Sequence, residues 1–467
     1  MRLFPKDFIF GTGTSAYQIE GAAAEDGKTP SIWDVFCADA DNVYKGQNGL
    51  TTCDHYHRVD EDIALMQQLG IEAYRFSISW PRIFPHKDVF NQKGLDFYIT
   101  LVAKLKKAGI MPVITLYHWD LPQWADALGG WLNRDCADWF AKLAETLFKA
   151  LADEVPYWIT HNEPFVATML GYYMGLHAPG HKDLKEALIA AHHLNISHGR
   201  AIQRFREIAK GTSKIGMTLN ISPGVPSEDT AEMRELALRA DGFVNRWFLE
   251  PLFRGTYPEY LTKLYRPIVG PLDFIQPGDA ELMTEPMDFL GVNFYKRNLV
   301  KKQEGRLLGY IGMDDPQPGT REEWAGYPKV LLELLRMIRR EYTDIPLMIT
   351  ENGLGLEGEV DDRSDASKFG TYITVKNGVD FIAEDGRVHD QTRIAYVENC
   401  LGQCLDFIEE GGRLEGYFLW SLMDNFEWAL GYSKRFGITY VDFTTFKRTI
   451  KDSGYWFRDV IKQRGLS

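Results

Sequence analysis

Two glutamates in this chain each stand at the end of a short apolar run. Glu163 lies in Thr160–Pro164 and follows the run 156–159, while Glu351 lies in Thr350–Gly353 and follows the run 345–349. Both patterns are typical of a buried β-strand that ends on a carboxylate. A buried, ionised carboxylate is costly unless a partner or a reaction uses it. Two of them in matching positions indicate the carboxylate pair that cleaves glycosidic bonds, although two separate structural ion pairs would leave the same pattern.

The elements that must position these glutamates alternate along the chain. Strands are predicted at Phe8–Thr12, Ala73–Ser79, Pro112–Tyr117, Tyr157–Asn162, Lys214–Asn220, Phe289–Phe294, Leu347–Glu351 and Gly416–Ser421. Amphipathic helices are predicted at His55–Leu69, Leu95–Ala108, Arg134–Leu151, Leu184–Ala209, Thr230–Phe248, Tyr327–Glu341, Gln391–Glu410 and Tyr455–Gln463. Alternating β and α segments without a low-complexity linker predict one α/β domain over residues 1–467, a (β/α)8 TIM barrel with elaborated βα loops.

The predicted strand ends are polar and aromatic. They carry Gln18, Glu20, Arg75, His118, Trp119, Asp120, Asn162, Glu163, Asn220, Asn293, Tyr295, Glu351, Asn352, Trp420 and Ser421. The carboxyl ends of the strands meet at one face of such a barrel, and its chemistry gathers there. The sequence therefore predicts one polar pocket with aromatic walls.

Composition excludes some classes of partner. The 467 residues carry a formal net charge of −13, which argues against nucleic acid or an anionic membrane, because both favour a basic face. The chain is rich in aromatic residues, with 12 Trp, 22 Tyr and 27 Phe. They predict a large core, and also flat platforms for a CH-rich ligand such as a sugar ring. A homo-oligomer is compatible with the sequence.

The cellular compartment is predicted from two features. No signal-peptide h-region and no apolar run of about 18 residues occurs. The five cysteines are odd in number and form no C-x-x-C motif, and the spacing of Cys400 and Cys404 predicts buried thiols on one helix. A reduced, cytoplasmic enzyme is expected.

Two patterns that could suggest a cofactor or metal are weak. Gly11–Ala16 resembles a dinucleotide fingerprint but has no following helix and no acidic residue ending a second strand. The pairs His55/His57 and His192/His193 have spacings that do not share one helix face, so solvated or core histidines are expected rather than a zinc site.

Five strings in order along the chain carry a resemblance. They are Phe8–Ala22, Tyr74–Arg82, Thr160–Pro164, Leu347–Gly355 and Trp420–Trp428. The chain resembles glycoside hydrolase family 1, close to the bacterial β-glucosidases, from about Phe4 to Leu466. The resemblance implies a retaining β-glycosidase on a TIM barrel without a metal or cofactor. Its expected substrates are terminal β-D-glucosides, including aryl and alkyl glucosides, cellobiose and short oligosaccharides, with side activity on β-galactosides and β-fucosides.

The resemblance also implies roles for individual residues. Glu351 is the expected nucleophile, Glu163 the acid/base, and Arg75 and Tyr295 the hydrogen-bond partners of the nucleophile. Retention needs two carboxyl groups about 5–5.5 Å apart. At that separation the charge of one raises the pKa of the other, so Glu163 is expected to stay protonated while Glu351 is ionised.

Nine further residues are implied to bind substrate. Asn162 is expected at the 2-hydroxyl, Glu427 at the 4- and 6-hydroxyls, and Trp420 under the ring. Gln18, His118 and Trp428 are expected near the 3-hydroxyl, and Trp119, Asn293 and Trp324 complete the set.

Two alternatives to a β-glucosidase remain open. A 6-phospho-β-glycosidase of this family usually has serine at the position of Glu427, with a lysine and a tyrosine beyond it. Here Lys434 is present, but Phe436 replaces the tyrosine, and a carboxylate repels a phosphate dianion at contact distance. The Glu-Asn-Gly-Leu-Gly tail after the nucleophile is also used by the phospho-enzymes. The second alternative is a non-catalytic sugar-binding protein, since a fold alone does not determine function.

Two segments depart from the family pattern. Phe165 stands where the family often has Trp, which leaves the leaving-group side undefined. The stretch 354–390 is long and follows the seventh strand, so it is expected over the pocket mouth. Within it, Asn377-Gly378 predicts a hairpin between Thr371–Val375 and Val379–Ala383, whereas the acidic residues before it are equally typical of a disordered loop.

Overall fold

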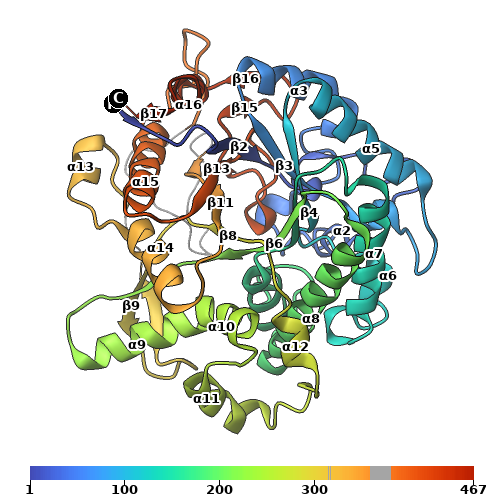
Figure 1. Cartoon of the computed structure of the whole chain (residues 1–467), viewed down its shortest axis with the longest axis vertical. Coiled ribbons are helices and arrows are strands. Elements are labelled where there is room, and N and C mark those ends of the chain that lie inside the picture. The colour runs from blue at the N-terminus through green and yellow to red at the C-terminus, as the bar shows by residue number, and fades with distance from the viewer. Residues whose placement is uncertain (314, 316, 358–379, 467) are drawn as a thin grey trace.

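Eight parallel strands close into a barrel at the centre of the molecule, and helices surround it (Figure 1). This computed structural model describes residues 1–313, 315, 317–357 and 380–466. In order around the barrel the strands are β2 (Ile9–Gly13), β3 (Ala73–Ser77), β4 (Met111–Tyr117), β5 (Tyr157–Asn162), β6 (Lys214–Asn220), β8 (Phe289–Asn293), β11 (Leu347–Asn352) and β13 (Leu414–Trp420). Strand β13 pairs with β2 and closes the barrel. The predicted fold class is confirmed, and each predicted strand end lies within two residues of the observed one.

The longer helices pack outside the barrel, and all but the last, α16, lie between successive barrel strands in the chain. They are α3 (Val59–Gln68), α5 (Gln92–Lys107), α7 (Cys136–Leu151), α8 (Leu184–Ile208), α9 (Ala231–Asp241), α10 (Trp247–Arg254), α11 (Glu259–Val269), α14 (Val330–Glu341), α15 (Gln391–Glu409) and α16 (Asp452–Gln463). Short helices lie in the connections: α1 (Ala16–Ile19), α2 (Ile32–Phe36), α4 (Trp80–Ile83), α6 (Gln123–Asp126), α12 (Asp279–Met283) and α13 (Arg321–Ala325). None of the helices in the described ranges is long and apolar enough to cross a membrane.

Short strands outside the barrel tie the loops and the two termini together. They are β1 (Arg2–Leu3), β7 (Gly224–Pro226), β9 (Asn298–Lys302), β10 (Tyr310–Met313), β12 (Leu356–Glu357), β14 (Lys434–Arg435), β15 (Thr439–Val441), β16 (Arg448–Ile450) and β17 (Gly465–Leu466). Strands β1 and β17 pair antiparallel, so the two chain ends lie side by side (Figure 1). Strand β12, just after the nucleophile strand, pairs with β14, which follows Glu427.

The predicted helix Thr230–Phe248 is interrupted in the structure. It begins as α9, passes through a π-helical turn at Gly242–Arg246 and continues as α10. The side chain of Asn245 in this turn bonds both backbone groups of Ser222, with Ser222 N to Oδ1 at 3.0 Å and Nδ2 to Ser222 O at 3.1 Å. A π-turn rotates the residues beyond it relative to a regular helix, and here it fixes the helix to the end of β6.

The closed barrel has an apolar floor beneath its polar end. A buried cluster of residues from the barrel strands consists of Ala73, Val113, Tyr157, Ile159, Phe289, Met348 and Phe418. Above it, Arg75 Nε donates to Thr115 Oγ1 at 3.1 Å, and both side chains are fully buried. A packed barrel interior is a core and not a pore, so it supports the groups at the carboxyl end rigidly.

Two loop and thiol predictions have different outcomes. Residues 371–379 of the predicted hairpin lie outside the described residues, and Asp380–Ala383 forms no strand. All five cysteines are free and buried, Cys400 and Cys404 among them, as their helical spacing predicts.

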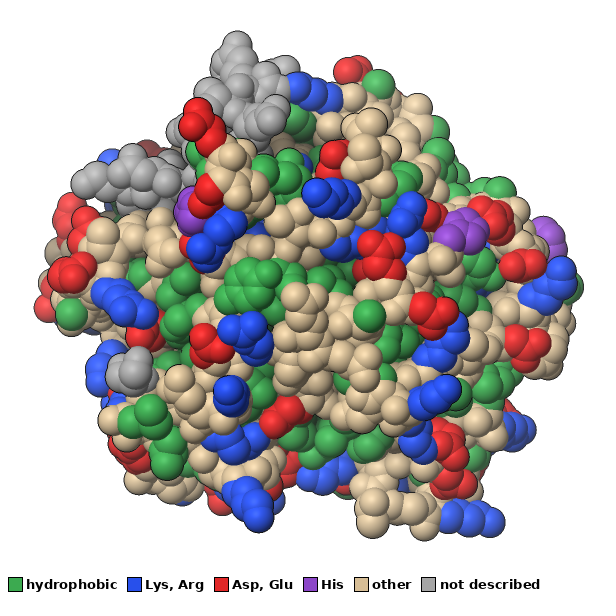
Figure 2. Space-filling model, turned by 90° about the horizontal axis from the view of Figure 1, so that it is seen from above, with side chains coloured by type: hydrophobic (Ala, Val, Ile, Leu, Met, Phe, Trp, Pro, Cys, Tyr) green, Lys and Arg blue, Asp and Glu red, His purple; other side chains and the backbone are tan. Residues whose placement is uncertain are grey.

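On the face of the molecule seen in Figure 2, acidic and basic side chains are interspersed and no basic side chains gather into one patch.

Candidate active site

Glu351 is the last residue but one of strand β11, and its carboxylate is held from two sides. Arg75 Nη1, from β3, donates to its Oε1 at 2.6 Å, and the hydroxyl of Tyr295, just beyond β8, donates to its Oε2 at 2.7 Å. The carboxylate is buried, and the guanidinium of Arg75 is fully buried beneath it. Charge-assisted hydrogen bonds of this kind are short and directional. The two hydrogen bonds hold the carboxylate in one orientation, and the positive charge of Arg75 complements it.

A pair of asparagines links the two glutamates. Arg75 Nη2 donates to Asn162 Oδ1 at 2.6 Å, and Asn293 Nδ2 lies 3.0 Å from the same oxygen. Asn293 Nδ2 also donates to Glu163 Oε1 at 2.7 Å. The amide of Asn293 is in turn oriented by Thr350, whose hydroxyl donates to Asn293 Oδ1 at 2.8 Å. The side chains of four barrel strands therefore form one continuous hydrogen-bonded layer.

Glu163 follows β5 and its side chain is buried. Burial raises the pKa of its carboxyl well above the usual value, and the negative charge of Glu351 raises that pKa further. The hydrogen bond from Asn293 and the charge of Arg75 lower the pKa in part. A carboxylic acid beside a carboxylate is the distribution of protons that general acid catalysis needs.

Three residues at this end of the barrel have left-handed backbone conformations. The φ angles are +75° at Trp119, +49° at Glu163 and +53° at Trp428. Side chains other than glycine adopt this region rarely, and such strain is concentrated where the surrounding structure must aim a side chain. All three residues face the same cavity.

That cavity has a volume of about 230 Å³ and contains both glutamates. Its wall consists of His118, Trp119, Glu163, Val166, Leu170, His177, Asn220, Ile221, Ser222, Asn293, Tyr295, Lys296, Glu351, Trp420, Glu427, Trp428 and Phe436. Most of these residues follow the carboxyl ends of the barrel strands. The predicted polar pocket with aromatic walls is therefore present at the predicted end.

The aromatic wall is built around His118. Its imidazole stacks on Trp420 with ring centroids 5.8 Å apart and on Trp428 at 5.9 Å, while Trp119 packs against Trp428 at 4.5 Å. Burial lowers the pKa of His118 well below its usual value, and the charge of Arg75 lowers it further. The imidazole is therefore neutral, and its Nε2 lies 3.1 Å from Asn162 Nδ2.

Gln18 and Glu427 form a second polar corner of the site. Gln18 Nε2 donates to the backbone oxygen of Phe426 at 2.8 Å and to Asn425 Oδ1 at 3.0 Å, and lies 3.5 Å from Glu427 Oε2. Burial raises the pKa of Glu427 to about 8, and the charge of Glu351 contributes to this rise. A half-satisfied carboxyl group at a cavity wall retains hydrogen-bonding capacity for a polar ligand.

Four predicted site residues are not part of the cavity wall. Arg75, Asn162 and Gln18 lie within hydrogen-bond distance of the wall residues Glu351, His118 and Glu427. The fourth is Trp324. It lies on α13 and packs against Tyr327 at 4.9 Å and Tyr396 at 5.5 Å. Together with Phe294 it lines a separate, very small cavity. The indole is buried against α15 because Tyr396 offers it an apolar face, so its expected contact with substrate has no support here.

Several wall residues were not predicted from the sequence. Val166 and Leu170 lie four residues apart on the π-helix Val166–Tyr173 that follows the acid/base motif, a spacing that could have placed them on one face. His177, Ser222 and Lys296 come from irregular segments. No periodic pattern marks such positions, because only the folded loops bring them to the wall.

No cluster of His, Cys, Asp and Glu side chains able to hold a metal occurs within the described ranges.

Comparisons with known proteins agree with this arrangement. A family model described as Glycosyl hydrolase family 1 matches residues 1–466. Beta-glucosidase A of Acetivibrio thermocellus is 44% identical over 99% of each chain, and a bifunctional beta-D-glucosidase/beta-D-fucosidase of Bifidobacterium breve is 40% identical over 98% of each. The solved family 1 b-glucosidase of Thermotoga maritima is 41% identical and superposes with a TM-score of 0.90, covering 100% of this chain and 99% of that one. The chain therefore belongs to glycosyl hydrolase family 1.

Proposed function

We propose that this chain is a retaining β-glucosidase that releases terminal, non-reducing β-D-glucosyl residues. One observation carries the proposal: Glu351 binds the guanidinium of Arg75 and the hydroxyl of Tyr295 in the same cavity as Glu163, whose pKa is raised by burial and by the charge of Glu351. The pair is what a two-step displacement at an acetal requires. The names of the relatives, beta-glucosidase in each case reported above, support the same activity.

In the first step, Glu351 attacks the anomeric carbon while Glu163 protonates the departing glycosidic oxygen. The C–O bond to the leaving group breaks as the bond to Glu351 Oε forms. Arg75 and Tyr295 orient the attacking carboxylate, because each donates a hydrogen bond to one of its two oxygens.

In the second step, water replaces the leaving group. Esterification removes the charge of Glu351, and that charge is one cause of the raised pKa of Glu163. The pKa of Glu163 therefore falls in the glycosyl-enzyme, and the same group acts as a base toward water. Two inversions at the anomeric carbon give net retention.

The sugar is recognised by the polar corner and the aromatic wall. Arg75 and His118 orient the amide of Asn162, which we expect at the 2-hydroxyl, where hydrogen bonds strengthen in the transition state. Glu427 and Gln18 take the hydroxyls at the far side of the ring, and Trp420 supports its apolar face. Val166 and Leu170 follow the acid/base glutamate and form part of the wall on the leaving-group side.

The same corner disfavours a 6-phosphorylated sugar. Glu427 occupies the wall with a carboxyl group, which repels phosphate once ionised. Lys434 lies 3.2 Å from Glu357 Oε1, an ion pair that competes with any phosphate for its ammonium. Phe436 offers no hydroxyl at the remaining position. The unphosphorylated glucoside is therefore the proposed substrate.

A hydrolysis panel tests the proposal. Aryl β-glucoside, β-galactoside, β-fucoside and 6-phospho-β-glucoside are compared by kcat/KM, and the first sugar released from the glucoside is followed by proton NMR. Preference for the glucoside with β-glucose formed first supports the proposal. Release of α-glucose first, a preference for the phosphorylated sugar, or binding without hydrolysis would contradict it.

The whole chain is proposed to work as one catalytic unit on small-molecule glucosides, in the cytoplasm. The location rests on five free, buried thiols, which a reducing compartment preserves. The net charge of −13 supports the absence of a nucleic-acid partner.

A further inference from the structure

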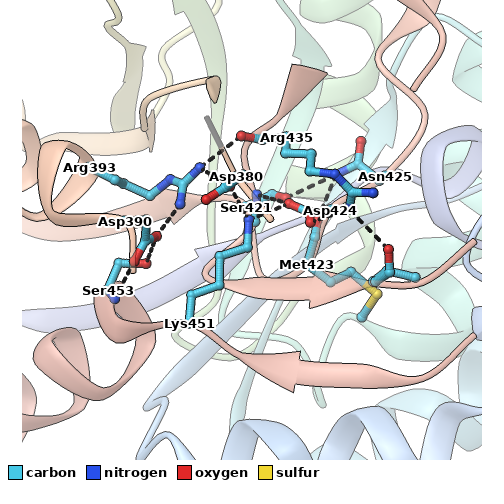
Figure 3. A network of polar contacts seen from close by, with 12 residues as sticks. Asp380, Asp390, Arg393, Ser421, Met423, Asp424, Asn425, Arg435, Lys451 and Ser453 are labelled. Atoms are coloured by element: carbon cyan, nitrogen blue, oxygen red, sulfur yellow. Dashed lines mark hydrogen bonds and ion pairs between the residues drawn. The ribbon is translucent and has the colours of Figure 1, made fainter. Parts of the chain in front are cut away.

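Six ionisable side chains form a buried ion network (Figure 3). It lies close along the chain to two residues of the cavity wall, Glu427 and Phe436. Its members are Asp380, Asp390, Arg393, Asp424, Arg435 and Lys451. Five of these side chains have no exposed surface, and Arg435 is 11% exposed. Three carboxylates face three cations, so the charges balance, and none of the six residues lines the cavity.

Lys451 lies at the centre of this buried ion network. Its Nζ is 2.7 Å from Asp424 Oδ1 and 2.5 Å from Asp380 Oδ2 (Figure 3). Asp424 belongs to the segment after β13, whereas Asp380 belongs to the connection between β11 and α15. One ammonium group therefore joins two loops that follow neighbouring barrel strands.

The Asp424 side of the network leads to the sugar-binding corner. Asp424 Oδ1 also accepts from Gly437 N at 3.0 Å, and Oδ2 accepts from Arg435 Nη1 at 2.7 Å. The next residue, Asn425, accepts from Gln18 Nε2 at 3.0 Å, and the same nitrogen lies 3.5 Å from Glu427 Oε2. The position of Asp424 thereby constrains Glu427, three residues further on.

The Asp380 side leads to the loop behind the nucleophile. Arg393 Nη2 donates to Asp380 Oδ2 at 2.7 Å, and its Nε donates to the backbone oxygen of Leu354 at 3.1 Å. Leu354 is three residues after Glu351. Arg393 also donates to the backbone oxygen of Arg435 at 2.8 Å, so the two loops are joined by charged and backbone contacts together.

We infer that Lys451 is a positioning residue that sets the place of Glu427 relative to Glu351, and thereby the preference for a sugar that carries a hydroxymethyl group on carbon 5. The inference rests on the proposed function, because it takes Glu427 as the group that meets the outer hydroxyls. Lys451 does not touch the sugar itself. Removal of the Lys451 side chain is expected to leave Glu163 and Glu351 in place. It is expected to make the position of Glu427, which is proposed to bind the outer hydroxyls of the sugar, less well defined.

The test compares two substrates that differ only at carbon 5. Aryl β-glucoside carries the hydroxymethyl group and aryl β-xyloside lacks it. Lys451→Met removes the cation at similar length but leaves an uncompensated buried carboxylate, which can unfold a protein. The double variant Lys451→Met/Asp380→Asn restores the charge balance and is the deciding one. Active sites are counted in each variant by burst titration with a 2-deoxy-2-fluoro glucoside, so kcat/KM refers to folded enzyme only.

The double variant is expected to lose about tenfold in the ratio of kcat/KM for glucoside over xyloside, while xyloside hydrolysis changes by less than about threefold. Arg134→Met is the control, since Arg134 pairs with the buried Asp279 on the helical layer and is not part of the cavity wall. The ratio of kcat/KM for glucoside over xyloside in this variant is expected to equal that of wild type. Lys451→Arg, which keeps a cation, is expected to retain most of the ratio.

Three outcomes would overturn the inference. An unchanged ratio in the double variant would show that Lys451 does not position Glu427. Equal losses on glucoside and xyloside would assign it a general structural role. A double variant without countable active sites would mean that the lysine is needed to fold the protein rather than to place one corner. Failure of the wild type to cleave any aryl glucoside would instead reject the proposed function, which separates the two ideas.

Discussion

Tyr295 donates its hydroxyl hydrogen to Oε2 of Glu351 at 2.7 Å, the carboxylate oxygen that Arg75 does not bind. Arg75 comes from β3 and Tyr295 from just beyond β8, and each satisfies one oxygen. This arrangement fixes the carboxylate plane, which matters because only one lone pair can approach the anomeric carbon.

The tyrosine contact leads to a first prediction. Tyr295→Phe is expected to lower kcat/KM about 10- to 100-fold, since a hydrogen bond to a charged group contributes about 1.5–3 kcal/mol. Steady-state kinetics on an aryl glucoside measure the change. Tyr265→Phe serves as the control, because its buried hydroxyl has no hydrogen-bond partner among the described residues. Equal effects of the two substitutions would show that the loss comes from packing alone.

Removal of the nucleophile gives the second prediction. Glu351→Gly is expected to reduce the rate by about four orders of magnitude or more, because no covalent intermediate can form. Azide is expected to restore turnover and to yield the α-glycosyl azide, through attack from the vacated face. NMR of the product decides the point, and a β-azide would refute the assignment of Glu351.

The raised pKa of Glu163 leads to the third prediction. As pH rises through that pKa the acid loses its proton, so kcat/KM is expected to fall on the alkaline side in the wild type. In Glu163→Ala this alkaline fall is expected to disappear for dinitrophenyl glucosides, which need no protonation of the leaving group. The same variant is expected to be harmed far more on poor leaving groups, with azide giving the β-azide. Similar losses on good and poor leaving groups would exclude Glu163 as the acid.

Discrimination against phosphate gives the fourth prediction. Glu427→Ser is expected to weaken glucoside hydrolysis and to raise the ratio for 6-phosphoglucoside about tenfold or more, because a carboxyl group that repels phosphate once it is ionised is removed. Adding Glu357→Gln is expected to raise the ratio further, since it frees Lys434 from its ion pair. Competition kinetics with both sugars measure the ratio. Glu357→Gln alone is the matched control, and an effect as large as that of the double variant would shift the assignment from Glu427 to Lys434.

Much of the candidate site could be predicted from the sequence. Strand β5, which leads to Glu163, is a short run of apolar residues, and its predicted range is identical to the observed one. A parallel barrel brings every strand end to one face, so Glu163, Glu351, Arg75 and Tyr295 could be expected together before any coordinates were known. The motifs around them supplied the expected roles.

Other features depended on contacts between distant segments. Trp324 has the same residue type as Trp420, yet α13 buries it against Tyr396 while Trp420 reaches the cavity. The π-turn at Gly242–Arg246 follows from the bonds between Asn245 and Ser222, two elements joined only in the fold.

The sequence by itself determined the alternation of elements, the barrel and the two carboxylates, because these follow from local periodicity and short motifs. Only the tertiary structure decided which oxygen each donor binds, that burial and Arg75 lower the pKa of His118, and that Lys451 joins two loops. Hydrogen-bond geometry and pKa depend on distances and dielectric between residues far apart in the chain. No local pattern in a sequence carries that information.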